Sequence, residues 1–154
     1  MGNTLGADHE VQLTAQWHRS NLQPLHDLTE LLDLEGIAER LWMGPGFRAE
    51  NDLLAADPPP PDSVRPFIEV TGARAGIIVS IGLDERVIGV IHVIMVGAPR
   101  VWTTPEANVV QAVAGFVAKA IVQAEHQAYQ RDYVARVGRP ARHTSDSLAN
   151  VSHE

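Results

Sequence analysis

The chain of 154 residues carries a formal net charge of −7, contains no cysteine, and is 45% hydrophobic. Its length and apolar content suit one domain with a short extension. The negative charge argues against nucleic acid or an anionic membrane as the main partner. The missing cysteines exclude disulfides, thiol nucleophiles and cysteine-based metal sites. With no signal-peptide pattern and no run of ~20 apolar residues to span a membrane, we expect a cytoplasmic protein.

The first third of the chain predicts a strand followed by helix and turn. Apolar and polar residues alternate over 8–18, which is typical of a half-buried strand. Leucines recur at helical spacing over 24–42 and predict one or two short helices, with a break at Gly36. A Gly-Pro-Gly turn at 44–46 precedes a short edge strand predicted over 47–51.

A proline-rich connection follows, and then a short helix. Residues 57–62 include four consecutive prolines, which lack backbone donors and favour an extended surface loop. A proline-motif ligand is the alternative, but no flanking basic residue supports it, so we favour the loop. Residues 63–70 predict a short helix, and Thr71-Gly72 ends it.

The stretch from Ala75 to Met95 organises the chain. Two runs rich in isoleucine and valine flank the polar segment 82–86, which predicts a β-hairpin. The second run, from Val87, is apolar on both faces, so we expect it to be the central strand of the sheet with elements packed on both sides. Gly89 would leave room there for the close approach of a neighbour.

A long helix is predicted to close the domain, starting near Thr104. Either Thr103 and Glu106 form a capping box, or Thr104 caps a helix whose first residue is Pro105. The helix is expected to run to about Val134. Its predicted core-facing stripe consists of Val109, Val113, Phe116, Val117, Ala120, Ile121 and Ala124.

The hairpin and the helix carry a family resemblance. The strand Ile78–Ile81, a short turn, the strand Val87–Val93, the aromatic Trp102 and the terminal helix resemble the signature of GAF domains, which are small cytosolic sensor modules. Ser80 stands where the family usually has proline. The resemblance implies an α+β fold, a GAF-like (PAS/GAF-type) central antiparallel β-sheet with flanking helices and a long C-terminal helix. It also implies an unidentified small ligand and a homodimer formed through the long helix.

The tail carries a second resemblance. Residues 145–154 read Ser-Asp-Ser-Leu-Ala-Asn-Val-Ser-His-Glu and closely resemble the H-box of two-component sensor histidine kinases. The match is complete from Leu148 onward, whereas Ser147 stands where the family usually has phenylalanine. The resemblance implies that His153 is the phosphoacceptor and Glu154 its acid/base partner. Imidazole has a free lone pair near neutral pH, and a carboxylate can orient the ring and take its proton. The alternative is a plain surface His-Glu pair.

Together these features predict a GAF-like sensor domain over 1–125, a helical extension over 126–144, and the start of a dimerisation and phosphoacceptor segment over 145–154. We expect the sensory input module of a two-component histidine kinase, ending just after the phosphoacceptor. ATP, Mg²⁺ and a response regulator would belong to the parent kinase, and this fragment alone should be inactive. Two alternatives are a non-enzymatic ligand-binding GAF protein and the input module of a cyclic-dinucleotide enzyme; the H-box argues against the latter.

Two further residues are candidates for ligand binding. His92 could line a ligand pocket or touch a haem, although a core histidine is the more frequent role of such a residue. Trp102 could form a pocket wall or part of the core. The seven histidines of the chain show no His-x-His or His-Glu-x-x-His spacing, so we expect no metal site and no cofactor in this chain.

Overall fold

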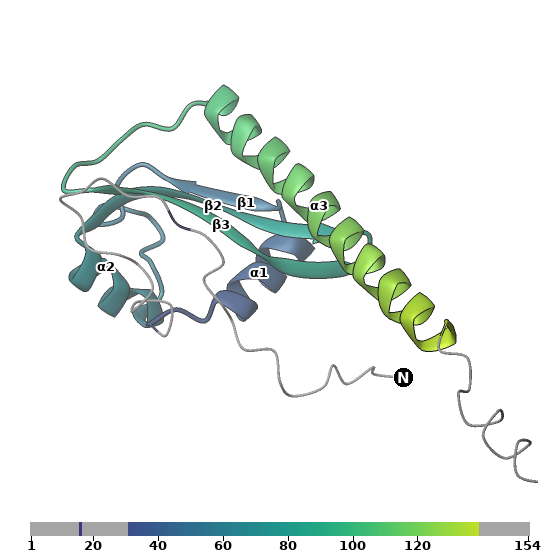
Figure 1. Ribbon diagram of the computed structural model, residues 1–154. Helices are drawn as coiled ribbons and strands as arrows, with labels where there is room; N and C mark the ends of the chain where they lie inside the picture. Colours follow the sequence, from purple (N-terminus) through teal and green to yellow (C-terminus); the bar gives the residue numbers. More distant parts are fainter. Residues whose placement is uncertain (1–15, 17–30, 139–154) are drawn as a thin grey trace, which may run out of the picture. The chain divides into compact units, whose positions relative to one another are not determined.

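The computed structural model describes Gln16 and residues 31–138 (Figure 1). The predicted strand over 8–18, apart from Gln16, and the H-box with His153 and Glu154 lie outside the described residues. The chain divides into two compact units, residues 1–118 and 119–154, and the boundary falls within the last helix. The first unit contains the sheet.

The sheet is built from three antiparallel strands in the order β1-β2-β3. These are β1 (Phe47–Glu50), β2 (Ala73–Leu83) and β3 (Arg86–Val96). Strands β2 and β3 form the predicted hairpin, with Leu83 paired to Arg86 and Asp84 in the left-handed region at φ 55°. Aspartate tolerates this conformation better than most side chains. The predicted edge strand is present as β1, which pairs only with β2 in the described sheet.

The centre of the sheet differs from the prediction. Among the described strands β2, not β3, is central, and its residues Ile77 and Val79 are buried. Strand β3 is half-buried to exposed along its length, and a Cβ atom at Gly89 would meet nothing within 4 Å. Apolar side chains report what covers the faces of a strand. They carry no information on whether a neighbour is hydrogen-bonded at its edge, and this is why the pattern misplaced β3.

The helical elements α1 (Leu34–Met43), η2 (a 3₁₀ turn, Asp62–Val64) and α2 (Arg65–Thr71) precede the hairpin. The break predicted at Gly36 is wrong. Gly36 lies in the first turn of α1, where its N–H donates to the carboxylate of the capping residue Asp33 at 2.9 Å. Helix α2 ends as predicted at Gly72, which adopts φ 67°.

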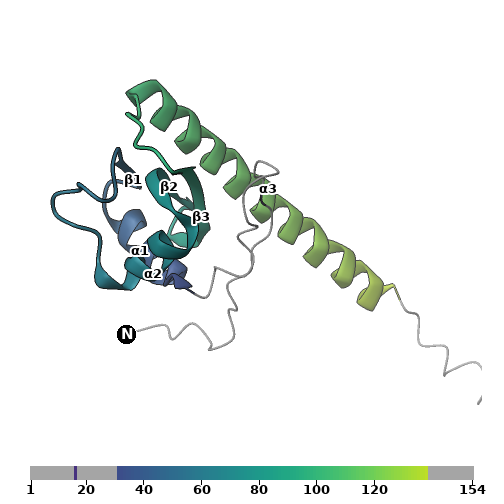
Figure 2. The same cartoon turned by 90° about the vertical axis from the view of Figure 1, so that its left-hand side faces the viewer.

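The two faces of the sheet carry different helices. Helices α1 and α2 lie on one face, and the first half of α3 (Thr104–Val137) packs on the other (Figures 1 and 2). On the α3 face, Ile77, Val79 and Ile81 form the core with three alanines of the helix. On the opposite face the ring of Trp42 lies so close to Gly82 that a Cβ atom there would approach it to 2.8 Å.

The core-facing side of α3 corrects the predicted stripe. Its buried residues are Ala107, Ala114 and Ala118, whereas Val109 is 62% and Phe116 71% exposed. These alanines form one hydrophobic cluster with Ile77, Val79 and Ile81 of β2, whose larger side chains fill the interface. The prediction placed the larger apolar residues in the core and therefore assigned the wrong side of the helix to the sheet. Val117 and Ile121 are nevertheless half-buried, as expected.

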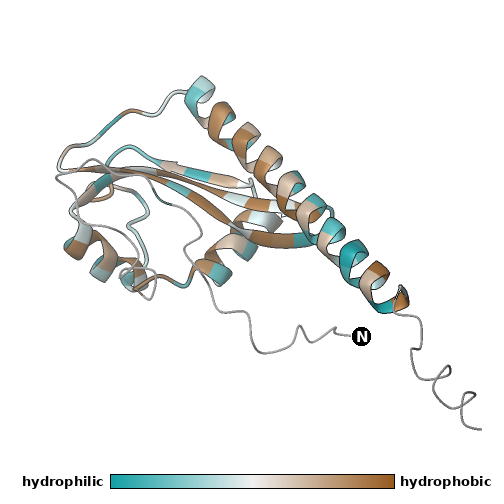
Figure 3. Ribbon diagram, in the orientation of Figure 1, coloured by the Kyte–Doolittle hydropathy of each residue, from teal (hydrophilic) through white to brown (hydrophobic). Residues whose placement is uncertain are grey.

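Helix α3 begins at Thr104 and ends at Val137, as the sequence predicted to within one turn. It is long and apolar enough to cross a membrane by length and composition, contrary to the expectation that no segment would be. Core helices of soluble proteins, which are mostly buried, pass the same criterion, whereas 17% of the apolar window of α3 is buried. Apolar residues gather in the first half of the helix, and hydrophilic ones prevail beyond it (Figure 3).

Candidate functional site

His92 lies on β3 on the face that α1 and α2 cover. Its ring stacks on Phe67 of α2, with centroids 5.7 Å apart and an angle of 26° between the planes. Its partner across the sheet is Ile78. A Cβ atom at Gly76 would lie 3.3 Å from His92 Nε2, so glycine at this position leaves the space that the imidazole uses.

Burial lowers the pKa of His92 to about 4. The side chain is therefore a neutral imidazole at neutral pH, which is the form that binds metals and ligands. Within the described part of the chain, no group of three or more His, Cys, Asp or Glu side chains could hold a metal ion. The close contacts with Phe67 and Gly76 favour a packing role for His92, and ligand binding by His92 stays a prediction.

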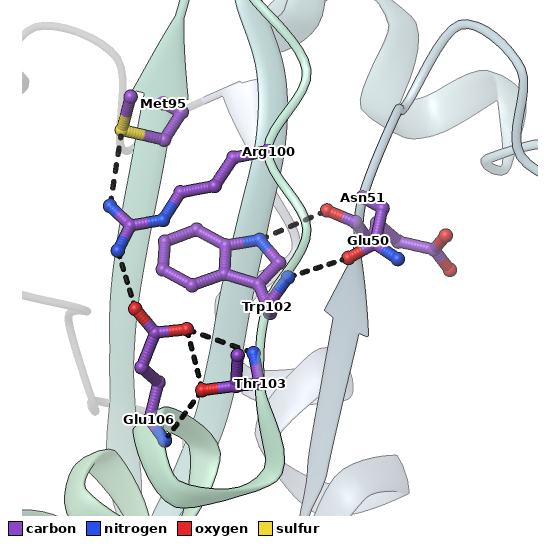
Figure 4. Close-up of polar contacts among 7 residues, drawn as sticks. All are labelled: Glu50, Asn51, Met95, Arg100, Trp102, Thr103 and Glu106. Atoms are coloured by element: carbon purple, nitrogen blue, oxygen red, sulfur yellow. Dashed lines mark hydrogen bonds and ion pairs between the residues drawn. The ribbon is translucent and has the colours of Figure 1, made fainter.

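Trp102 lies on the other side of the sheet, at the start of α3 (Figure 4). Its indole Nε1–H donates to the carbonyl oxygen of Glu50 at 3.2 Å, and its backbone N–H donates to Asn51 Oδ1 at 2.9 Å. The guanidinium of Arg100 lies 4.5 Å from the centroid of the indole ring, within cation–π distance. Trp102 thereby joins the end of β1 to the segment that enters α3.

The capping box at the start of α3 is confirmed and extends this contact. The carboxylate of Glu106 accepts from the backbone N–H of Thr103 at 2.8 Å and from its hydroxyl at 2.9 Å. Arg100 donates to the second carboxylate oxygen at 2.5 Å. The Thr103 N–H, the Thr103 hydroxyl and Arg100 together hold the pKa of Glu106 below its ordinary value.

We call the residues Glu50, Asn51, Arg100, Trp102, Thr103 and Glu106 the helix clamp. The sequence singled out Trp102 and the capping pair but missed the other members. The backbone N–H of Arg100 also donates to the carbonyl oxygen of Asn51 at 3.0 Å, a contact that no local sequence pattern predicts. The signal for Arg100 in the sequence is its position two residues before Trp102. The helix clamp fixes the start of α3 against the end of β1.

The predicted site residues do not form one site. His92 pairs with Ile78, which lies between the core residues Ile77 and Val79 in β2 and therefore points to the opposite face, the one that α1 and α2 cover. Trp102 packs against the core cluster on the α3 face. His153 and Glu154 lie outside the described residues. The described chain therefore presents a packed imidazole on one face and a clamped helix on the other.

No protein-family model and no curated protein matches this chain. Solved structures do. The chain is similar to GAF3 from Slr1393 of Synechocystis sp. PCC6803 in its photoproduct state, at 22% identity and a TM-score of 0.58, over 72% of this chain and 73% of that one. It is also similar to the GAF domain of the cyanobacteriochrome TePixJ, at 16% identity and a TM-score of 0.60, over 70% and 67%.

A third similar structure is that of the cyanobacteriochrome receptor PixJ, at 14% identity and a TM-score of 0.52, over 70% of this chain and 71% of that one. Identities this low establish the fold and nothing finer. The antiparallel sheet, the flanking helices and the long terminal helix agree with the fold expected from the hairpin, Trp102 and the helix. The chain has the α+β fold of a GAF domain.

Proposed function

We propose that this chain is the sensory input module of a two-component histidine kinase. The observation that carries the proposal is the combination of a GAF fold with the sequence that follows its last helix. Helix α3 ends at Val137, and the H-box motif Leu148–Glu154 comes after it in the chain. A sensor fold that leads through a helix to a phosphoacceptor motif is arranged as an input module should be.

The helix clamp supports a role for α3 in output. Trp102 and Arg100 tie the first turn of α3 to the end of β1, so a rearrangement of the sheet would be passed to the helix at this point. His92 and Phe67 lie on the opposite face, between β3 and α2. In the proposal a small ligand acts on that face, and α3 carries the change outward.

The chemistry of the proposal resides in the tail. His153 would accept the phosphoryl group on a ring nitrogen, and Glu154 would orient the ring and take its proton. ATP and Mg²⁺ would be held by a separate catalytic domain, and a response regulator would take the phosphoryl group from His153. The chain alone is then expected to show neither ATP hydrolysis nor autophosphorylation.

A chimera tests the proposal. The chain is joined after Glu154 to the remaining bundle helices and ATP-binding domain of a characterised histidine kinase and incubated with labelled ATP and Mg²⁺. We expect an acid-labile, base-stable label that His153→Gln abolishes. His126→Gln is the matched control, since His126 is an exposed histidine of α3 outside the motif, and it should leave the label in place.

The result that overturns the proposal is equally direct. If the chimera is folded and remains unlabelled, while the same kinase part joined to its own sensor is labelled, the motif of this chain is not a phosphoacceptor site. Label that survives His153→Gln would also reject the assignment of His153.

A further inference from the structure

Residues 51–54, which follow β1, contact two other parts of the fold. On one side Asn51 belongs to the helix clamp. Its carbonyl oxygen accepts from the backbone N–H of Arg100 at 3.0 Å. Its side chain accepts from the backbone N–H of Trp102 at 2.9 Å (Figure 4). On the other side the segment lies against Arg74 at the start of β2. We call residues 51–54 the bridging turn.

Arg74 holds the bridging turn with its backbone and with its side chain. Its carbonyl oxygen accepts from the Leu53 N–H at 2.7 Å. Its guanidinium donates to both carboxylate oxygens of Asp52, from Nε at 3.1 Å and from Nη2 at 2.7 Å. Asp52 Oδ1 also accepts from the Leu54 N–H at 3.1 Å. An arginine–carboxylate pair with two hydrogen bonds fixes direction as well as distance, so this contact sets the geometry of the turn.

The ion pair between Asp52 and Arg74 is partly withdrawn from water. The two side chains are 27% and 29% exposed, against 63% and 68% for Asp33 and Arg40 of α1 and its cap. Water and salt screen a partly buried pair less than an exposed one. The pair also joins two residues that are 22 positions apart. It therefore connects separate elements of the sheet unit.

A second set of hydrogen bonds leads from Arg74 back to α2. The Thr71 hydroxyl donates to the carbonyl oxygen of Phe67 at 2.6 Å and accepts from the N–H of Ala73 at 3.2 Å. Phe67 carries the ring on which His92 stacks. Ala73 directly precedes Arg74 in the chain. A shift of α2 against the sheet would therefore reach Arg74 through the Thr71 hydroxyl.

These contacts form one continuous path from α2, through the start of β2 and the bridging turn, to the helix clamp. We propose that the bridging turn transmits movement of α2 to the start of α3, and that Asp52 is the positioning residue that engages it through Arg74. The turn then has two arrangements, held on Arg74 or released, because coupling between sites needs an element with discrete states. The inference rests on the proposed function for the source of the movement, a small ligand on the α1 and α2 face.

A shorter route also joins α2 to the segment before α3. The Gly97 N–H donates to the carbonyl oxygen of Gly72, the residue that ends α2, at 3.0 Å. This bond bypasses Asp52. Gly97 lies outside the helix clamp, whereas the bridging turn bonds directly to Arg100 and Trp102, and this favours the bridging turn. A test must ask whether Asp52 is needed.

Amide hydrogen exchange of the full chain, resolved residue by residue with NMR, provides that test without a ligand. The reporters are the backbone amides of Arg100 and Trp102, which the bridging turn holds. The amide of Val79 in the central strand is the reference for global unfolding. Thr71→Val removes the hydroxyl that links α2 to Ala73. We expect it to speed the exchange of both reporters about 10-fold relative to the reference, as for the loss of one hydrogen bond.

The same substitution in an Asp52→Asn background decides the role of the ion pair. Asp52→Asn keeps the size of the side chain but removes its charge and one of the two bonds from Arg74. Alone it should also speed the exchange of the reporters. Thr71→Val should then add less than about 2-fold, because the path is already broken and the two substitutions are not additive.

Arg48→Met is the matched control. It removes another ion pair, from Arg48 Nε to Glu50 Oε1 at 2.7 Å, which lies within β1 directly before the bridging turn. This pair does not join separate elements, so the reporters should exchange as in the wild type.

Three results would overturn the inference. Equal effects of Thr71→Val in both backgrounds would assign the transmission to the bond between Gly97 and Gly72. Reporters that respond to neither Thr71→Val nor Asp52→Asn would show that α2 and the start of α3 are not coupled. A response to Arg48→Met as large as that to Asp52→Asn would show that the reporters follow any loss of charge near β1. No kinase is involved, so these failures are distinct from failure of the proposed function, which the chimera tests.

Discussion

At the scale of single residues, His92 is the titratable side chain of the described part of the chain whose pKa burial lowers to about 4. It has an aromatic ring on one side and a glycine where any Cβ would crowd it. An imidazole in such a place is held neutral, because burial penalises the charged form. This gives the fold a measurable dependence on pH.

Between about pH 4 and 6.5 the unfolded chain binds a proton at His92 that the native chain excludes, since the pKa is about 4 when folded against 6.5 in the reference state. The free energy of unfolding therefore increases with pH across this window. Lowering the pH from 6.5 to 4 should decrease it by at most about 3 kcal/mol. We predict that His92→Leu flattens this dependence. Urea unfolding of both proteins at pH 4.5 and 7 checks it, and parallel pH profiles would contradict it.

Trp102 is the second residue with an individual prediction. Trp102→Phe keeps an aromatic ring in the core but removes the Nε1–H that donates to Glu50. The carbonyl of Glu50 then loses its partner, and we expect the free energy of unfolding to fall by about 1–2 kcal/mol. Urea titration measures this. Arg100→Met removes the cation above the ring and the ion pair with Glu106 but retains the hydrogen bond from Trp102 to Glu50. We expect it to lower the free energy of unfolding by less than Trp102→Phe does, because the lost ion pair is exposed. A larger loss would contradict this prediction.

At the scale of elements, the hairpin contains two glycines with opposite surroundings. A Cβ at Gly82 would lie 2.8 Å from the carbonyl oxygen of Arg86 and from Trp42, whereas one at Gly89 would meet nothing within 4 Å. We predict that Gly82→Ala destabilises the protein by about 1–3 kcal/mol through overpacking. Gly89→Ala should be neutral or stabilising by roughly 0.5–1 kcal/mol. The melting temperatures of the two variants test this prediction. Equal values would show that Trp42 can move away from β2 at little cost in free energy.

The elements also show what a sequence can and cannot specify. The hairpin, the Gly72 stop and the Thr103–Glu106 capping box depend on neighbours within a few residues, and all three were predicted. The central position of β2 depends on its pairing with β1, 26 to 32 positions earlier in the chain, and the partners of Trp102 lie 51 and 52 positions away. No local pattern encodes either. The buried side of α3 was missed for another reason, since alanines count little in hydropathy but decide how closely a helix can pack.

At the scale of the whole molecule, the two parts of α3 have different sources of stability. Residues from Ala107 to Ile121 include the positions that pack on the sheet, whereas Gln123 to Val137 are exposed throughout. An isolated helix of about 15 residues is marginal in water. The outer part of α3 therefore lacks the packing contacts that stabilise the first part.

This gives a prediction for amide hydrogen exchange of the full chain. Amides from Ala107 to Ile121 should be protected, because Ala107, Ala114 and Ala118 of this part pack on the sheet. Amides beyond Gln123 should exchange at close to the unprotected rate, because that part of the helix is exposed. Equal protection of the two parts would show that the outer part of α3 is stable without packing on the sheet.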